Sequence, residues 1–139
     1  MARRPPARRV CLQETKAQDH QFPEDVFTDA GYEVAFFGQK TYNGVAIASK
    51  HGLDDVVKGV PGFDDDARGI AATVLGVWVC NVYVINGKSL GHQRWHDKLG
   101  WYGKLKNWVV EDGGTDRDFV LFGDFNLCPT DEDTWDAKA

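Results

Sequence analysis

The residues best suited to chemistry form a short acidic segment after an apolar run. Residues 123–126 read Gly-Asp-Phe-Asn and follow the apolar residues 119–122. In an extended chain, the side chains of Asp124 and Asn126 share one face, and Gly123 leaves room for a backbone or ligand to approach closely. A carboxylate can hold a cation or take a proton while an amide orients an oxygen, which suits metal-assisted hydrolysis. A plain turn is the alternative interpretation, because Gly, Asp and Asn are common turn residues.

A second carboxylate, Glu14, also follows a short apolar run, residues 10–12. Mg²⁺ takes hard oxygen ligands, often one or two carboxylates together with water and substrate phosphate. Glu14 and Asp124 would suit such an ion if the fold brought their strand ends to one rim. The alternative is that Glu14 is a solvated turn residue or an acid in the first turn of a helix.

Four segments in order resemble the motifs of one nuclease family. They are Cys-Leu-Gln-Glu-Thr-Lys at 11–16, Tyr-Asn-Gly-Val-Ala-Ile at 42–47, Asn-Val-Tyr-Val-Ile-Asn-Gly at 81–87 and Gly-Asp-Phe-Asn at 123–126. Together they resemble the exodeoxyribonuclease III-like nucleases of the endonuclease/exonuclease/phosphatase superfamily. Ile85 departs from the Tyr-Val-Pro-Asn-Gly that is common in the family. The match covers nearly everything from Val10 to Ala139.

The resemblance implies an α/β fold, a partial four-layer sandwich of the deoxyribonuclease I-like type, over residues 10–139. Residues 1–9 are expected to be an irregular basic leader. Family members begin with a strand that carries an asparagine near the metal, and they continue beyond the equivalent of Ala139 with more strands, another aspartate and an Asp-His pair. We therefore expect a chain that lacks both ends of the domain, with impaired hydrolysis. Uncovered sheet edges should favour self-association or loose packing.

The function implied by the resemblance is Mg²⁺- or Mn²⁺-dependent phosphodiester hydrolysis in DNA, as a 3′-to-5′ exonuclease or an abasic-site endonuclease in repair. Glu14 would bind the metal ion, and Asp124 would orient or deprotonate the attacking water. Asn126 and Tyr83 would hold the scissile phosphate. The expected partner is duplex DNA with an abasic site or a 3′ end, and no obligate protein partner is inferred. The alternatives are a hydrolase of the same superfamily acting on RNA or a phospholipid, or a noncatalytic fragment.

Three further residues are candidates for substrate binding, each with a structural alternative. Tyr42 and Asn43 would touch a DNA backbone from a loop, although Asn-Gly at 43–44 is also a strong turn dipeptide. Arg68 could meet a phosphate through its planar guanidinium, or it could form an ion pair with one of the aspartates at 64–66. Tyr83 could equally be a packed aromatic residue.

Composition limits the classes of protein that remain. The chain has 139 residues, 42% of them hydrophobic, so we expect one folded domain. A net charge of −5 argues against a nonspecific nucleic-acid coat. No apolar segment is long enough to span a membrane, and we expect a cytoplasmic location. The three cysteines lack zinc-ligand spacing, with Cys11 and Cys80 expected to be buried thiols. His92 and His96 are expected to be solvated helix residues.

Apolar patterning predicts alternating strands and helices. Strands are expected at 8–13, 32–37, 45–49 and 118–124, a strand or turn at 53–58, and a hairpin of 69–75 with 77–84 around Gly76. Helices are expected at 22–30, ending at Gly31, and at 92–110. The apolar face of the second helix would carry Trp95, Leu99, Tyr102, Leu105, Trp108 and Val109. Residues 38–43, 61–66 and 111–115 are expected to be turns or loops, and 127–139 to be irregular.

Overall fold

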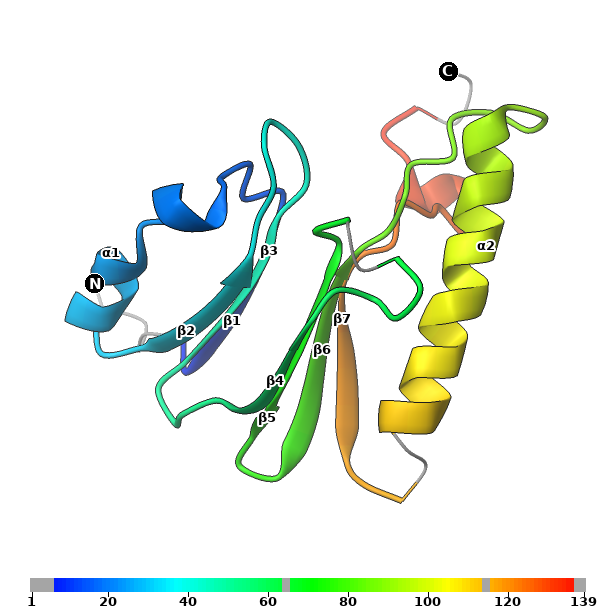
Figure 1. Ribbon diagram of the computed structural model, residues 1–139. Coiled ribbons are helices and arrows are strands. Elements are labelled where there is room, and N and C mark those ends of the chain that lie inside the picture. Colours follow the sequence, from blue (N-terminus) through cyan, green and yellow to red (C-terminus); the bar gives the residue numbers. More distant parts are fainter. Residues whose placement is uncertain (1–6, 64–65, 114–115, 137–139) are drawn as a thin grey trace.

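The computed structural model describes residues 7–63, 66–113 and 116–136, which form two β-sheets (Figure 1). The first sheet has the order β1-β3-β2 and the second has the order β4-β5-β6-β7. All neighbouring strands are antiparallel except β6 and β7, which are parallel. The strands are β1 (Arg9–Gln13), β2 (Glu33–Phe37), β3 (Val45–Ser49), β4 (Asp54–Lys58), β5 (Gly69–Val74), β6 (Val77–Tyr83) and β7 (Phe119–Asp124).

Helices lie on the outer faces of the two sheets, so the described elements form four layers (Figure 1). Helix α1 (Glu24–Asp29) packs beside β2, and the longer α2 (Gln93–Trp108) runs along the second sheet. A π-helical turn, Val109–Gly113, continues α2, and short 3-10 turns lie at Asp19–Gln21 and Asp131–Asp133. The expected α/β fold with four layers is confirmed. Among the described residues, no helix is both long and apolar enough to cross a bilayer.

Strands β5 and β6 are buried on both faces because each separates two apolar cores. One face of β5, including Ile70 and Ala72, packs in the core between the sheets, while Ala71 faces the core beneath α2. The α2 core also contains Trp78, Trp101 and Trp108. This alternation follows from the two-residue period of a strand. It explains why both strands read as nearly continuous apolar runs.

Asn81 of β6 is a buried polar residue that joins the two sheets. It has no solvent exposure. Its amide nitrogen donates to the carbonyl oxygens of Leu12 (2.8 Å) and Ala46 (3.0 Å), and its side-chain oxygen accepts from Gln13 Nε2 (2.5 Å). Because buried polar groups are costly unless they are hydrogen-bonded, this network favours one relative placement of the sheets. It also ties the end of β1, just before Glu14, to the strand that carries Tyr83.

The structure confirms most of the predicted strands. Strand β3 matches 45–49 and is buried throughout, and the hairpin of β5 and β6 turns at Gly76. The region 53–58 forms strand β4, which is exposed along its length at the sheet edge. Arg9, which was expected both at the end of the leader and within the strand 8–13, belongs to β1, while residues 1–6 lie outside the described part of the chain.

Three local predictions are wrong. Helix α1 begins at Glu24 rather than Phe22, because Pro23 disfavours helical geometry in the residue before it. The predicted loop at 111–115 is a π-helical turn as far as Gly113. Leu99 is 52% exposed, and Lys98 and Trp101 occupy the buried face of α2 instead. Positions 98, 101, 105 and 108 share one side of a helix of 3.6 residues per turn, which leaves Leu99 to one side of it.

Strand β7 leaves an apolar edge exposed in the described structure. Phe119, Val120 and Phe122 are 44%, 38% and 47% exposed, and β7 is the terminal strand of its sheet. The free edge of a terminal strand with apolar side chains can pair with another chain. This edge is the surface on which the expected self-association depends, and that association stays a prediction.

Candidate active site

Three of the sequence-predicted residues have left-handed backbone conformations. Glu14, Asn43 and Asn126 have φ angles of 53°, 59° and 47°. Such conformations are uncommon for residues other than glycine and often occur at functional sites. The segment after Glu14 is held by backbone hydrogen bonds from Thr15 N to Gly44 O and from Lys16 N to Asn43 O, at 3.2 and 2.9 Å. The loops that carry Glu14 and Asn43 are therefore joined directly.

Tyr83 lies between the two acidic segments. It is paired with Asp124 in the parallel register of β6 and β7. Hydrogen bonding from Lys16 and then from Tyr83 lowers the pKa of Glu14. The pKa of Tyr83 is raised, first by burial and then by the Glu14 carboxylate, with a smaller contribution from Asp124. Glu14 and Asp124 are distant in sequence, yet both raise the pKa of the same tyrosine. Their carboxylates therefore lie at the same end of the sheets.

The directions of these pKa shifts define the charge state of the site. With a lowered pKa, the exposed Glu14 carboxylate stays ionised from neutral into mildly acidic solution. With a raised pKa, the Tyr83 hydroxyl stays protonated at neutral pH and can donate a hydrogen bond. Lys16 Nζ lies 2.9 Å from Glu14 Oε2, so a cation that binds this carboxylate must compete with an exposed ion pair.

Asp124 and Asn126 are not related by the strand period that the sequence suggested. Strand β7 ends at Asp124, and the left-handed φ of Asn126 breaks the extended geometry. Instead, Asn126 N donates to Asp124 Oδ1 (2.8 Å), and Asn126 Nδ2 donates to the carbonyl oxygen of Val84 (2.8 Å). A hydrogen bond across a local turn places the two residues side by side. The structure therefore contains the turn that was the alternative interpretation, and it also places a carboxylate beside an amide.

Gly123 allows the backbone of β6 to approach closely, as its position before Asp124 suggested. Its φ is 150°, and a Cβ atom added there would lie 2.0 Å from the carbonyl oxygen of Val82. That overlap involves backbone atoms of a paired strand, so neither side can move without disturbing the β6–β7 pairing. The glycine is needed for the geometry that brings Asp124 beside Tyr83.

Gly123→Ala is expected to destabilise the fold by about 1–3 kcal/mol or more, because overpacking forces a backbone shift. Gly103→Ala is the matched control, since Gly103 lies on an exposed part of α2 with no atom near an added Cβ. The control should be stabilising by up to about 1 kcal/mol through helix propensity. Urea unfolding of both variants measures the difference, and equal stability of Gly123→Ala and the unmodified chain would contradict the close approach.

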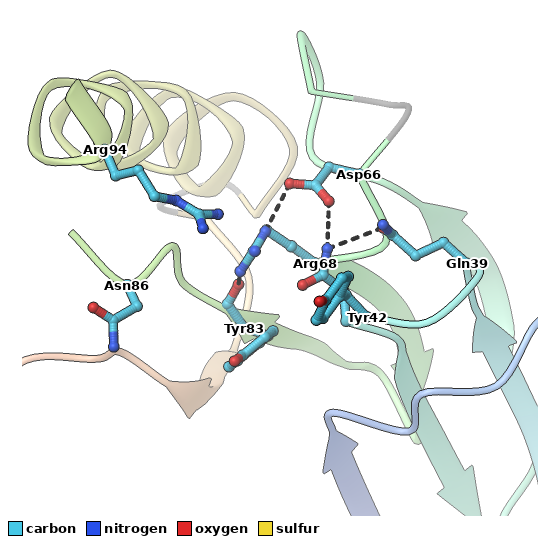
Figure 2. A pocket seen from close by; sticks show the side chains of 8 residues that line it. Gln39, Tyr42, Asp66, Arg68, Tyr83, Asn86 and Arg94 are labelled. Carbon is cyan, nitrogen blue, oxygen red and sulfur yellow. Dashed lines mark hydrogen bonds and ion pairs between the residues drawn. The ribbon is translucent and has the colours of Figure 1, made fainter. Parts of the chain in front are cut away.

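A cavity of about 360 Å³ lies beside Tyr83 (Figure 2). It is lined mainly by residues that carry hydrogen-bonding groups: Gln39, Tyr42, Asn43, Asp66, Arg68, Tyr83, Asn86 and Arg94. Figure 2 shows Arg68 between Asp66 and Tyr83, with Arg94 reaching toward the same space from α2. Two guanidinium groups, two phenols and three amides are suited to phosphate oxygens and to nucleotide rings.

Arg68 forms the ion pair that was the alternative interpretation for it. Arg68 Nε lies 2.7 Å from Asp66 Oδ2, and Nη1 donates to the carbonyl oxygen of Tyr83 (3.2 Å). The side chain is buried, and its guanidinium lies 4.9 Å from the centre of the Tyr83 ring. One guanidinium nitrogen of Arg68 therefore hydrogen-bonds to the main chain of Tyr83 and is not free for a ligand. The positive charge of Arg68 also helps to lower the pKa of Glu14.

The two predicted loop residues differ in exposure. Tyr42 is 68% exposed and free to meet a ligand at the rim of the cavity. Asn43 is buried, and its amide nitrogen donates to Gln39 Oε1 (3.0 Å) and Asp66 Oδ1 (2.6 Å). Asn43 and Gly44 both have positive φ and lie in the loop of residues 38–44 that joins β2 to β3. Asn43 mainly holds the loop that presents Tyr42.

Sequence reasoning missed three residues of the cavity, Gln39, Asn86 and Arg94. Asn86 could have been found, since it follows Tyr83 within the quoted 81–87 segment and its Nδ2 lies 3.4 Å from Asn126 Oδ1. Arg94 gave no local signal, because it is one of many polar residues at the start of α2. The preceding His92 caps that helix by accepting a hydrogen bond from Arg94 N (3.1 Å).

The other residues singled out in the sequence are two histidines and two cysteines. His92 and His96 are exposed, and no group of three His, Cys, Asp or Glu side chains suited to a metal ion occurs in the described part of the chain. Cys80 is buried and Cys11 half-buried, and burial raises the pKa of the Cys11 thiol to about 11.

Comparison with known proteins gives a consistent result over most of the chain. The profile described as "Endonuclease/Exonuclease/phosphatase family" matches residues 10–139. Exodeoxyribonuclease III from Haemophilus influenzae is 32% identical over 131 residues, which cover 89% of this chain and 49% of that protein.

Solved structures extend the comparison to the fold. The 3′-5′ exonuclease NExo from Neisseria meningitidis is 40% identical with a TM-score of 0.88, covering 96% of this chain and 53% of that one. A second NExo structure, described as a 3′ phosphatase bound to product DNA hairpin, has a TM-score of 0.87 at 40% identity, covering 94% and 52%. An AP endonuclease from Archaeoglobus fulgidus is 36% identical with a TM-score of 0.82, covering 88% and 48%. The chain thus spans about half the length of each relative.

Proposed function

The chain belongs to the endonuclease/exonuclease/phosphatase family, and from this premise we propose that it acts in divalent-metal-dependent hydrolysis of phosphodiester bonds in DNA. The single observation that carries the proposal is that the carboxylates of Glu14 and Asp124 converge on Tyr83, whose pKa both of them raise. Tyr83 lines a cavity that arginine and amide side chains also line. The names of the similar proteins, an exodeoxyribonuclease, a 3′-5′ exonuclease and an AP endonuclease, support DNA as the substrate.

Glu14 is the residue proposed to hold Mg²⁺ or Mn²⁺. Its ionised carboxylate is exposed and provides the hard oxygen donor that Mg²⁺ prefers, with water and phosphate completing the coordination. A cation bound there supplies neutralisation of phosphate charge and stabilisation of the leaving oxygen. Because the metal ion must compete with Lys16 for this single carboxylate, we expect binding to be weak.

Asp124 is the proposed base or orienting group for the attacking water. Its exposed carboxylate lies at the strand end, and one oxygen already accepts a hydrogen bond from Asn126 N. Its second oxygen can accept from a water molecule. The proposed donors to the scissile phosphate are the Tyr83 hydroxyl, which would exchange its hydrogen bond to Glu14 for one to the phosphate, and the second N–H of the Asn126 amide. Both would offset charge that develops during the reaction.

DNA binding is proposed to use the cavity beside Tyr83. Tyr42 projects from its rim, and Arg94 offers an exposed guanidinium on α2, whereas Arg68 and Asn43 act mainly by shaping the wall. The substrate would be duplex DNA with an abasic site or a 3′ end. A 3′ phosphate is a second candidate for the cleaved group, because the similar NExo protein is described as a 3′ phosphatase.

Glu14→Gln tests the metal site without relying on activity. Mn²⁺ binding, followed by the paramagnetic resonance signal of the free ion, is expected to be weak in the unmodified chain and lost in the variant, because glutamine has no charge. Glu24→Gln is the matched control, since Glu24 is exposed in the first turn of α1. Equal Mn²⁺ binding by Glu14→Gln and Glu24→Gln would refute the assignment.

Cleavage of labelled abasic-site and 3′-end duplexes, with protein in excess over DNA, tests the function itself. We expect only slow cleavage, in keeping with the impaired hydrolysis predicted from the sequence, that requires Mg²⁺ or Mn²⁺ and that Glu14→Gln removes. Cleavage that persists in chelator, or RNA or phospholipid hydrolysis without DNA cleavage, would overturn the proposal in favour of another activity.

A further inference from the structure

Lys98 of α2 carries a buried charge. The side chain is 4% exposed, and its ammonium forms no ion pair with any carboxylate of residues 7–63, 66–113 and 116–136. Removing an ammonium from water is costly unless strong hydrogen bonds replace the water. The ammonium donates to the main-chain carbonyl oxygen of Asn126, and it lies 5.9 Å from the centre of the Tyr102 ring. This placement gives a charged donor to one residue of the candidate site.

The turn formed by residues 124–126 is held at every carbonyl oxygen. Val84 N donates to Asp124 O (2.8 Å), Tyr102 Oη donates to Phe125 O (2.8 Å), and Lys98 donates to Asn126 O. Lys98 and Tyr102 are four residues apart, so they project from the same face of α2. Two of the three contacts therefore come from one helix that is otherwise distant in sequence from the turn.

The contacts from α2 to the turn help to fix the positions of the Asp124 and Asn126 side chains. Asn126 keeps a left-handed φ of 47°, which costs free energy unless the surroundings hold it. In this conformation Asn126 N reaches Asp124 Oδ1 and Asn126 Nδ2 reaches Val84 O, both at 2.8 Å. A release of the Asn126 carbonyl would therefore free both the amide of Asn126 and one oxygen of Asp124.

We propose that Lys98 is a positioning residue, whose buried ammonium acts with the Tyr102 hydroxyl to hold the 124–126 turn and so orient the Asp124 carboxylate and the Asn126 amide. This role rests on the proposed function. A purely structural lysine would instead bury its methylene stem and contribute packing alone. The two roles predict different effects of removing the charge. A positioning role predicts a local loosening of the 124–126 turn, whereas a purely structural role predicts only a change in global stability.

Lys98→Met separates these roles, because methionine keeps an unbranched apolar stem and removes the charge. Amide hydrogen exchange at residues 124–126 should become roughly tenfold faster or more, since a local opening loses a charged hydrogen bond. Global stability in urea should be unchanged or higher, because a buried charge has been replaced by an apolar group. Lys106→Met, on the exposed side of the same helix, is the control and should change neither quantity.

Kinetics on abasic-site DNA provide the second measurement. Lys98→Met should lower kcat with little change in KM, because the turn presents groups to the reacting phosphate. Lys98→Arg retains a cationic donor and should restore part of the exchange protection and of kcat. If the unmodified chain cleaves no DNA, the proposed function fails while the exchange measurement still decides whether Lys98 holds the turn.

Exchange at residues 124–126 that is unchanged in Lys98→Met, or that rises only as much as global stability falls, would overturn the proposal. If Lys98→Met does not fold, Tyr102→Phe carries the same test, since it removes a single hydroxyl from the same turn. Faster local exchange in Tyr102→Phe, with global stability retained, is the expected result. Unchanged exchange there would show that α2 does not hold the turn.

Discussion

Asp124→Asn is expected to lower metal-dependent DNA cleavage by about 100-fold to 10,000-fold, the range typical for loss of a general base. Asparagine keeps an oxygen that can accept the hydrogen bond from Asn126 N, so the turn should survive. What disappears is the negative charge and the basicity needed to orient or deprotonate water. The measurement is single-turnover cleavage of a labelled abasic duplex in Mg²⁺ or Mn²⁺.

Asp118→Asn is the matched control for this prediction. Asp118 immediately precedes β7, at the opposite end of the strand from Asp124, and it is exposed. The change in net charge is the same, so a general electrostatic effect on DNA binding would appear in both variants. A similar loss of cleavage in the two variants, or an Asp124→Asn variant that remains active, would contradict the assigned role.

Trp108→Ala is expected to cost about 3–5 kcal/mol of unfolding free energy, because it empties a large part of a packed core. Trp108 is 1% exposed, and its ring meets Trp78 edge to face, with centroids 5.5 Å apart and an interplanar angle of 87°. Gly69 lies directly beneath it, since a Cβ added there would lie 3.3 Å from the indole ring. The loss should therefore loosen the contact between α2 and the second sheet.

Trp135→Ala is the control for the core prediction. Trp135 is fully exposed, so the substitution should change stability by less than about 0.5 kcal/mol. Urea unfolding monitored by circular dichroism measures both variants on one scale. Trp108→Phe adds a second comparison, since it loses area but also removes an indole N–H that has no hydrogen-bond partner within the described residues. Its cost should fall well below that of alanine.

The sequence was sufficient to place most of the elements that position the site. Strand β3, the hairpin of β5 and β6 and the final strand each follow from short apolar runs bounded by glycine or polar residues. Hydrophobic periodicity is a local property, so a single sequence reveals it directly. The same local patterning pointed to Glu14 and to the segment 123–126, because each lies at the end of a short apolar run, whereas Tyr83 was identified from the family resemblance.

Only the tertiary structure decided what the individual polar groups contact. Arg68 pairs with Asp66, Asn43 uses its amide inside the protein, and Asn126 is placed by a left-handed turn rather than by strand alternation. Each of these polar groups could have bonded to several partners, to water or to a ligand. A sequence pattern does not show which of these partners lies within hydrogen-bonding distance in the folded chain. The turn at 123–126 shows this most clearly, since the sequence allowed either a turn or an aligned pair and the structure contains both features.

The face of α2 was decided in the same way. Apolar spacing led us to bury Leu99, yet the structure buries Lys98, because the carbonyl oxygen of Asn126 offers its ammonium a partner. Asn81 is buried between the sheets for a similar reason, with Leu12, Gln13 and Ala46 as its partners. Sequence alone determined the strands, the order of the motifs and the residue types at the site. Long-range hydrogen bonds, which satisfy buried polar groups with partners far along the chain, decided how those residues are oriented.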